Sequence, residues 1–161
     1  MGEVLMAIPK GCAPSHAVPA KLKKWLEEEE FSYVQLIGEL ARNTLFSYHL
    51  TLPYDTEITV FQATDRKDSV NVSAVLLLSA EQVKKLREKS KKEQEEFFSD
   101  LCFKLAPLDV DLTLEGGEVY RSISLNHQIF YDGLAKDRFF KAIALIDKAH
   151  SLAKWITKHS L

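Results

Sequence analysis

The sequence predicts an α+β domain in which helices cover one face of an antiparallel, five-stranded sheet. Apolar residues recur with a period of two in five short segments, and turn residues separate consecutive segments. Apolar residues at helical spacing occupy the chain before, between and after these strands. The expected order is therefore α-β-β-β-α-β-β-α, and 161 residues suit one domain.

The chain is predicted to begin with an arm, residues 1–18, which Pro9 and Pro14 interrupt. The single domain is then expected to span residues 19–161, starting with a short helix at Pro19, a residue that suits a first helical turn.

The apolar face of that helix is formed by Leu22, Trp25 and Leu26. Residues 32–43 stay ambiguous, because a short strand over 34–37 and a helical turn over 35–42 fit equally well.

Three strands joined by tight turns are predicted to follow from Thr44. Their apolar positions are Phe46, Tyr48, Leu50, Leu52, Ile58, Val60, Val70, Val72, Ala74 and Leu76. Such a meander pairs neighbouring strands antiparallel.

Ser79 and Gln82 have the spacing of a capping box at the start of the middle helix, and Ser90 is a possible restart. The buried stripe is expected to consist of Phe97, Phe98, Leu101, Cys102 and Leu105. Pro107 ends this helix.

Two further strands alternate from Leu108 to Leu114 and from Val119 to Ile129 around the hairpin turn Glu115-Gly116-Gly117. Asp132-Gly133 is a turn dipeptide, with glycine accepting a positive φ. Asp137 is predicted to be the N-cap of the last helix.

One face of this sheet is expected to be uncovered and polar. It would carry Ser47, His49, Thr51, Asn71, Ser73, Asp109, Asp111, Thr113, Ser122, Ser124 and Asn126. The last helix carries a second apolar stripe, Leu145, Leu152 and Trp155, in addition to its core-facing one. That stripe predicts a further partner, either the arm or a second subunit in a homodimer.

Three stretches resemble the motifs of a prokaryotic family rich in archaeal members, the domain-of-unknown-function family 2299. They are Lys24-Trp25-Leu26-Glu27-Glu28-Glu29, Glu95-Glu96-Phe97-Phe98 with Leu101 and Phe103, and the ten residues from Ile129 to Arg138. The resemblance covers about residues 20–160. It implies a fold similar to type III secretion chaperones, which are commonly dimers that hold a partner segment extended, and it implies no activity.

Several kinds of chemistry lack a motif in the sequence. The five histidines have no metal-ligand spacing, the two cysteines form no CxxC pair, and nucleotide-binding glycine loops are missing, so no cofactor or metal is expected. The net charge of −2 gives no reason to expect nucleic acid or a membrane surface as a partner. The basic run over residues 84–92 is interrupted by glutamates and fits a solvated helix face.

Two small polar sites stay open as hypotheses. Asp109 and Asp111, at i and i+2 on one strand face, could bind a cation or act as an acid pair with His49 nearby. The closing motif offers Tyr131, Asp132, Asp137 and Arg138, for which structural roles are favoured: a turn, a cap and an ion pair.

The sequence thus predicts a cytoplasmic, non-catalytic module that binds an unidentified protein or peptide in a chaperone-like way. The alternative is a small enzyme with a polar or metal site on the open sheet face.

Overall fold

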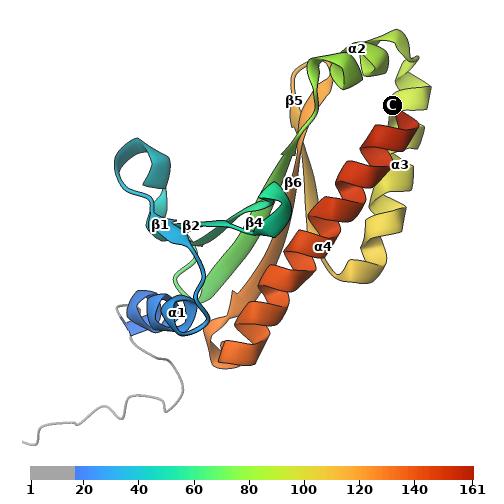
Figure 1. Ribbon diagram of the computed structural model, residues 1–161. Helices are drawn as coiled ribbons and strands as arrows, with labels where there is room; N and C mark the ends of the chain where they lie inside the picture. The colour runs from blue at the N-terminus through green and yellow to red at the C-terminus, as the bar shows by residue number, and fades with distance from the viewer. Residues whose placement is uncertain (1–16) are drawn as a thin grey trace, which may run out of the picture.

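The computed structural model describes residues 17–161 and has one α+β architecture, as the sequence predicts (Figure 1). The first half contains α1 (Ala17–Glu28), β1 (Tyr33–Gln35), η1 (Gly38–Ala41), β2 (Thr44–Thr51), η2 (Pro53–Asp55), β3 (Glu57–Ala63) and β4 (Ser69–Leu77). The second half contains α2 (Ala80–Glu88), α3 (Lys91–Leu105), η3 (Ala106–Leu108), β5 (Asp111–Gly116), β6 (Tyr120–Phe130), η4 (Tyr131–Gly133) and α4 (Lys136–Ser160).

The sheet has six antiparallel strands in the order β1-β2-β3-β4-β6-β5, so the prediction of five strands was wrong. The additional strand is β1, which lies in the stretch that the sequence left ambiguous and pairs Val34 with His49 of β2. The same stretch also holds η1, so it contains both a strand and a helical turn. The other five strands were predicted in their observed order.

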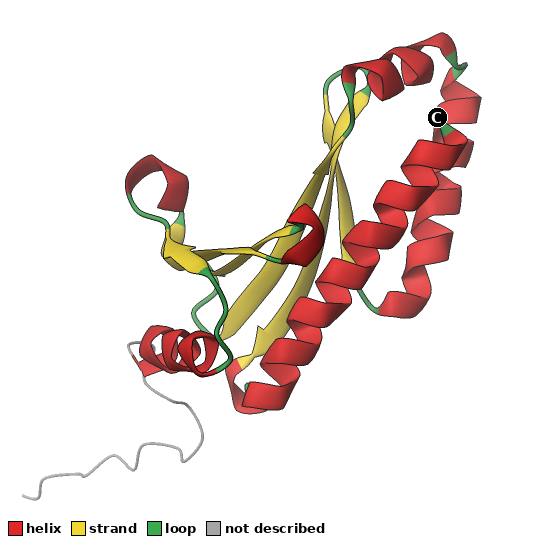
Figure 2. Ribbon diagram, in the orientation of Figure 1, coloured by secondary structure: helices red, strands yellow, loops and turns green. Residues whose placement is uncertain are grey.

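The middle of the chain forms two helices. Ser79 and Gln82 make the predicted capping box at α2, and Ser90 makes a second one with Glu93 at α3. The break between them at Lys89 leaves α3 free to turn and lie beside α4 (Figure 2).

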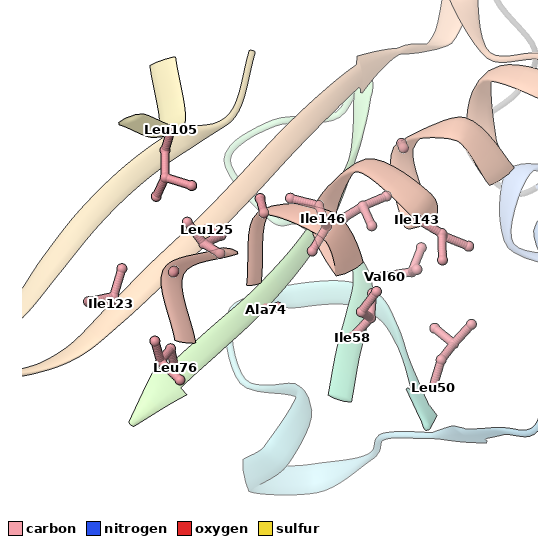
Figure 3. Close-up of a cluster of buried hydrophobic side chains, with 14 of the residues drawn as sticks. Leu50, Ile58, Val60, Ala74, Leu76, Leu105, Ile123, Leu125, Ile143 and Ile146 are labelled. Carbon is pink, nitrogen blue, oxygen red and sulfur yellow. The ribbon is translucent and has the colours of Figure 1, made fainter. Parts of the chain in front are cut away.

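The core lies between the apolar face of the sheet and the helices (Figure 3). Leu50, Val60 and Leu125 are among the buried strand residues. Leu22 of α1, Leu105 of α3 and Ile146 of α4 pack into the same cluster. The period-two pattern therefore identified the core side of every long strand.

Two expectations fail at the level of single residues. Cys102 is exposed rather than buried, although Leu101 and Leu105 beside it are buried as predicted. Asp109 is not in β5: it has a left-handed backbone, with φ 53°, at the end of η3. The predicted pair of strand aspartates at i and i+2 therefore does not form.

Residues 1–16 of the predicted arm lie outside the described residues. Ala17 and Val18, the last two residues of that arm, belong to α1, and Val18 is buried. None of the helices within residues 17–161 has the length and hydrophobicity that crossing a membrane requires.

Candidate functional site

A groove of about 450 Å³ lies between one edge of β6 and the first half of α4. Four consecutive residues of β6, 127–130, line one side. Because a strand face would offer only alternate residues, four in a row show that the groove follows the edge of the strand. The other side is one stripe of α4, and the η4 turn contributes Asp132 and Gly133. The α4 residues are Arg138, Lys141, Ala142 and Leu145. We refer to this feature as the β6 groove.

The edge of β6 in the groove has no neighbouring strand in the described sheet. β5 covers the strand only from Asn126, the partner of Asp111, towards the hairpin. On the other side β4 accompanies β6 to its end, where Ser69 pairs with Phe130. Four residues of strand edge, about 14 Å long, are thus left open.

The late start of β5 has a local cause. Pro107 in η3 has no N–H to give to a sheet, and the left-handed backbone of Asp109 turns the chain before it meets β6. The Asp109 carbonyl lies 3.1 Å from Nδ1 of His127. This contact lies at the end of the groove where β5 begins.

His127 was not among the predicted site residues. It pairs with Val72 on the core-facing side of β6, in the same alternation as Leu125 and Ile129. A histidine at an apolar position of an alternating strand is a sequence signal that could have identified it. The alternation itself could not have shown that β5 starts too late to pair with this residue.

Two of the five closing-motif candidates line the groove from the turn that precedes α4. Asp132 and Gly133 belong to η4, as the turn prediction requires. The described glycine with positive φ is Gly38, so Gly133 does not serve the turn through a positive φ. A Cβ at Gly133 would come within 2.6 Å of Nη1 of Arg138, which shows how closely that side chain covers the turn.

Asp137 and Arg138 take roles that differ from those predicted. Ala135 is the N-cap of α4, and Asp137 lies in the first turn, 3.5 Å from Lys141. Arg138 donates to the Gly133 carbonyl at 3.4 Å. Within residues 17–161 no carboxylate lies within ion-pair distance of Arg138, so the predicted pairing with an acid is wrong. Tyr131 donates from its hydroxyl to Oε1 of buried Gln62.

The second apolar stripe of α4 is divided among different environments. Leu145 is half-buried and lines the β6 groove. Leu152 packs against the core. Trp155 is 58% exposed and stacks on His159 at 4.4 Å between ring centroids.

The candidates on the open sheet face do not come together. A single row across the strands runs from Val34 through His49, Thr59, Ser73 and Asn126 to Asp111. His49 and Asp111 are four strand spacings apart in it, about 19 Å. His49 instead lies 3.9 Å from Glu57. The part of the chain that the structure describes contains no group of three potential metal ligands.

The three candidates on β6 have mixed surroundings. An amide side chain lies next to Asn126, whereas apolar side chains lie opposite Ser122 and Ser124. Asn126 donates to Oδ1 of Asn71 at 3.1 Å, while its own Oδ1 is buried and has no partner among the described residues. Ser122 and Ser124 are opposite Leu77 and Val75. Leu77 is 75% exposed, so this face is less polar than the sequence predicts.

The opening and closing motifs meet where α1 reaches the start of α4. Lys136 makes ion pairs with Glu28 at 2.9 Å and with Glu29 at 2.7 Å, and Trp25 packs on Phe139 with ring centroids 5.9 Å apart. Hydrogen bonds to Glu29 and Glu28 raise the pKa of Lys136, and the hydrogen bond from Lys136 lowers the pKa of Glu28. These motif residues hold the fold together beside the groove.

The sequence profile of a family described as an uncharacterized conserved protein, DUF2299, matches residues 19–157. The chain belongs to this family. The expected resemblance to this family is therefore confirmed, and the match runs from Pro19 in α1 to Thr157 in α4.

One solved structure resembles this chain over most of its length. The chain is similar to an uncharacterized protein from Methanothermobacter thermautotrophicus, known from a crystal structure. The two are 28% identical with a TM-score of 0.76, over 91% of this chain and 99% of the other. No protein with a curated description gives a significant match.

Proposed function

We propose that this DUF2299 protein is a non-catalytic binding module that takes up an extended segment of a partner protein along the β6 groove. The observation that carries the proposal is the open edge at residues 127–130, next to the stripe of α4 that faces it. An unpaired strand edge offers backbone donors and acceptors in the spacing of a further strand, and adjacent pockets for alternate side chains supply selectivity.

The size of the groove suits a short segment. Four strand residues match a guest of four or five residues, and Ile129, Ala142 and Leu145 give it an apolar wall. The bound segment would pair with β6 directly beyond the start of β5. Backbone pairing and the burial of one apolar side chain would then both contribute to its affinity.

A chaperone-like role is part of the proposal. The resemblance implies proteins that hold a partner segment in extended form, and the β6 groove suits a segment of that kind. We place the module in the cytoplasm, which the free and exposed thiol of Cys102 supports, because oxidising compartments favour disulfides.

We also propose a homodimer, formed through the C-terminal half of α4. Its support is Trp155, a large aromatic side chain with more than half of its surface exposed. Aromatic residues of this kind are enriched in the centres of protein interfaces.

Selection from a display library of random ten-residue peptides tests strand addition in the groove. Selected peptides, labelled with fluorescein, are expected to bind the full chain and to protect the amides of 127–130 from hydrogen exchange. Leu145→Asn removes one of the three apolar side chains of this wall and is expected to weaken binding roughly tenfold. The matched control is Leu152→Asn, the same change two turns further along α4 outside the groove.

The control variant is expected to bind within twofold of the parent chain once circular dichroism has shown both variants to be folded. Three results would each refute strand addition in the groove: no peptide is enriched, the selected peptides protect other residues, or both variants lose the same affinity.

A further inference from the structure

We infer that the segment bound in the β6 groove carries a carboxylate side chain, which pairs with Arg138. This inference rests on the proposed function and names the chemistry of the partner: an acidic residue close to an apolar one in an extended segment. Its basis is an arginine that lines the groove, is exposed to solvent and has no acidic partner among the described residues.

Within residues 17–161, the guanidinium of Arg138 leaves most of its hydrogen-bonding capacity unused. An arginine offers five N–H donors in a planar fork that matches a carboxylate. Among the described residues, this side chain makes one hydrogen bond, from Nη1 to the Gly133 carbonyl, which is long at 3.4 Å. That contact holds the guanidinium over the turn, where the missing Cβ of Gly133 leaves room for it.

The charges along the groove favour an anionic guest. Its lining carries the cations Arg138 and Lys141 and the single carboxylate of Asp132. Lys141 has an ion pair with Asp137 outside the lining, at 3.5 Å with both side chains largely exposed, and such pairs contribute little. No ion pair joins Asp132 to either cation within residues 17–161. A carboxylate on the guest would meet the arginine without displacing an existing partner.

The spacing along α4 fixes where the carboxylate lies relative to the apolar side chain. α4 runs beside β6 (Figure 1). Arg138 and Ala142 are four residues apart on the helix, about 6 Å, and two residues of a strand span about 7 Å. Side chains two apart on a strand point to the same side. The segment is therefore expected to have an acidic residue two positions from an apolar one.

Two peptide libraries test the inference. They are identical except that one encodes Asp and Glu at the random positions and the other encodes Asn and Gln. Binders from the acidic library that protect residues 127–130 are expected to have a carboxylate two positions from an apolar residue. Their affinity is expected to fall about threefold to tenfold when Asn or Gln replaces that residue.

Variants of the protein separate a role in binding from one in folding. Arg138→Gln is expected to lower affinity for the acidic peptide about threefold to tenfold and to leave affinity for its amide counterpart unchanged. Arg138→Lys should recover part of the loss, since it keeps the charge and loses the fork. The control is Arg121→Gln, an exposed arginine of β6 outside the groove.

Salt provides a second readout, because the preference for the acidic peptide is expected to shrink as NaCl rises from 50 to 500 mM. Equal affinities for acidic and amide peptides that both protect 127–130 would overturn the carboxylate and keep strand addition. Peptides that protect other residues would overturn strand addition itself, so the two failures are distinguishable.

Discussion

Gln62 is a polar side chain with no exposed surface at a core-facing position of β3. Its Nε2 donates to the Arg66 carbonyl at 3.3 Å, and its Oε1 accepts from the Tyr131 hydroxyl. Buried amides of this kind are tolerated only with partners, because losing one leaves the group desolvated and unpaired. The pair thus ties η4, at one end of the β6 groove, to the turn after β3.

Tyr131→Phe is expected to lower the free energy of unfolding by about 1–3 kcal/mol, since it leaves the buried Oε1 of Gln62 without this donor. Urea denaturation followed by circular dichroism measures the change. Tyr54→Phe serves as the control, because Tyr54 is almost fully exposed and should shift stability by less than about 0.5 kcal/mol. Equal effects of the two substitutions would contradict this role of the hydroxyl.

Residue roles in this turn were the least accurate part of the sequence-based prediction. The local pattern favours Asp137 as the N-cap, because aspartate is common there. The helix begins earlier, at Lys136, which Glu28 and Glu29 hold through ion pairs across more than a hundred residues of sequence. Contacts at such sequence separation have no local signature, and the same applies to Gln62 and Tyr131.

α1 and the residues directly after it fasten the start of α4, through aromatic contacts and a charged one. Trp25 and Phe31 pack on Phe139 and Phe140, and Lys136 bridges to Glu28 and Glu29. The ionised carboxylates are therefore part of what keeps α1 docked.

Acidification is expected to loosen α1. The folded-state pKa of Glu28 lies below its usual value of 4.5, so the contribution of its ion pair is full above that value and is lost as pH falls through the lowered one. Urea unfolding followed by Trp25 fluorescence, in a Trp155→Phe background, should show stability falling below about pH 4.5.

A variant tests the cause of this pH dependence. Lys136→Met is expected to flatten it, whereas Lys141→Met, which breaks an ion pair within α4 alone, is expected to keep it. Because partners raise the pKa of Lys136, its contribution is present below its usual value of 10.5 and declines as pH rises through the raised one. An unchanged acid response in Lys136→Met would show that other carboxylates cause it.

At the scale of elements, periodicity predicted the five longer strands, the capping box of α2 and the order of segments. It could not decide on β1, which has three residues, too few for an alternation. β1 forms because Tyr33, Val34 and Gln35 pair with β2, and Leu36 donates to Ser47 beyond the strand. Pairing of that kind depends on register rather than on local pattern.

At the scale of the whole molecule, the sheet has one face covered by helices and one open face. The helices contribute to a single core cluster. Apolar surface also lies outside that core, at Leu77 on the open face, at Phe103 on α3 and at Trp155 on α4. The position of the β6 groove follows from the strand order, which the sequence left undetermined.

Light scattering tests the proposed homodimer. The chain is expected to have twice its 18.3 kDa mass, and Trp155→Arg should shift it to the monomer mass. Tyr54→Ser, at another exposed aromatic, should leave the dimer intact. A monomer at all concentrations up to the millimolar range would contradict the dimer and leave binding in the β6 groove unaffected.

The left-handed backbone at Asp109 has a consequence for which partners could be accepted. A guest lying where β5 turns away would share the pleat of β6, so every second side chain would face α4 and the ones between would face water. Segments that share only the side chains facing α4 should then compete equally for the β6 groove. Many unrelated chains could satisfy so sparse a code, so the proposed module would be able to bind several different partners.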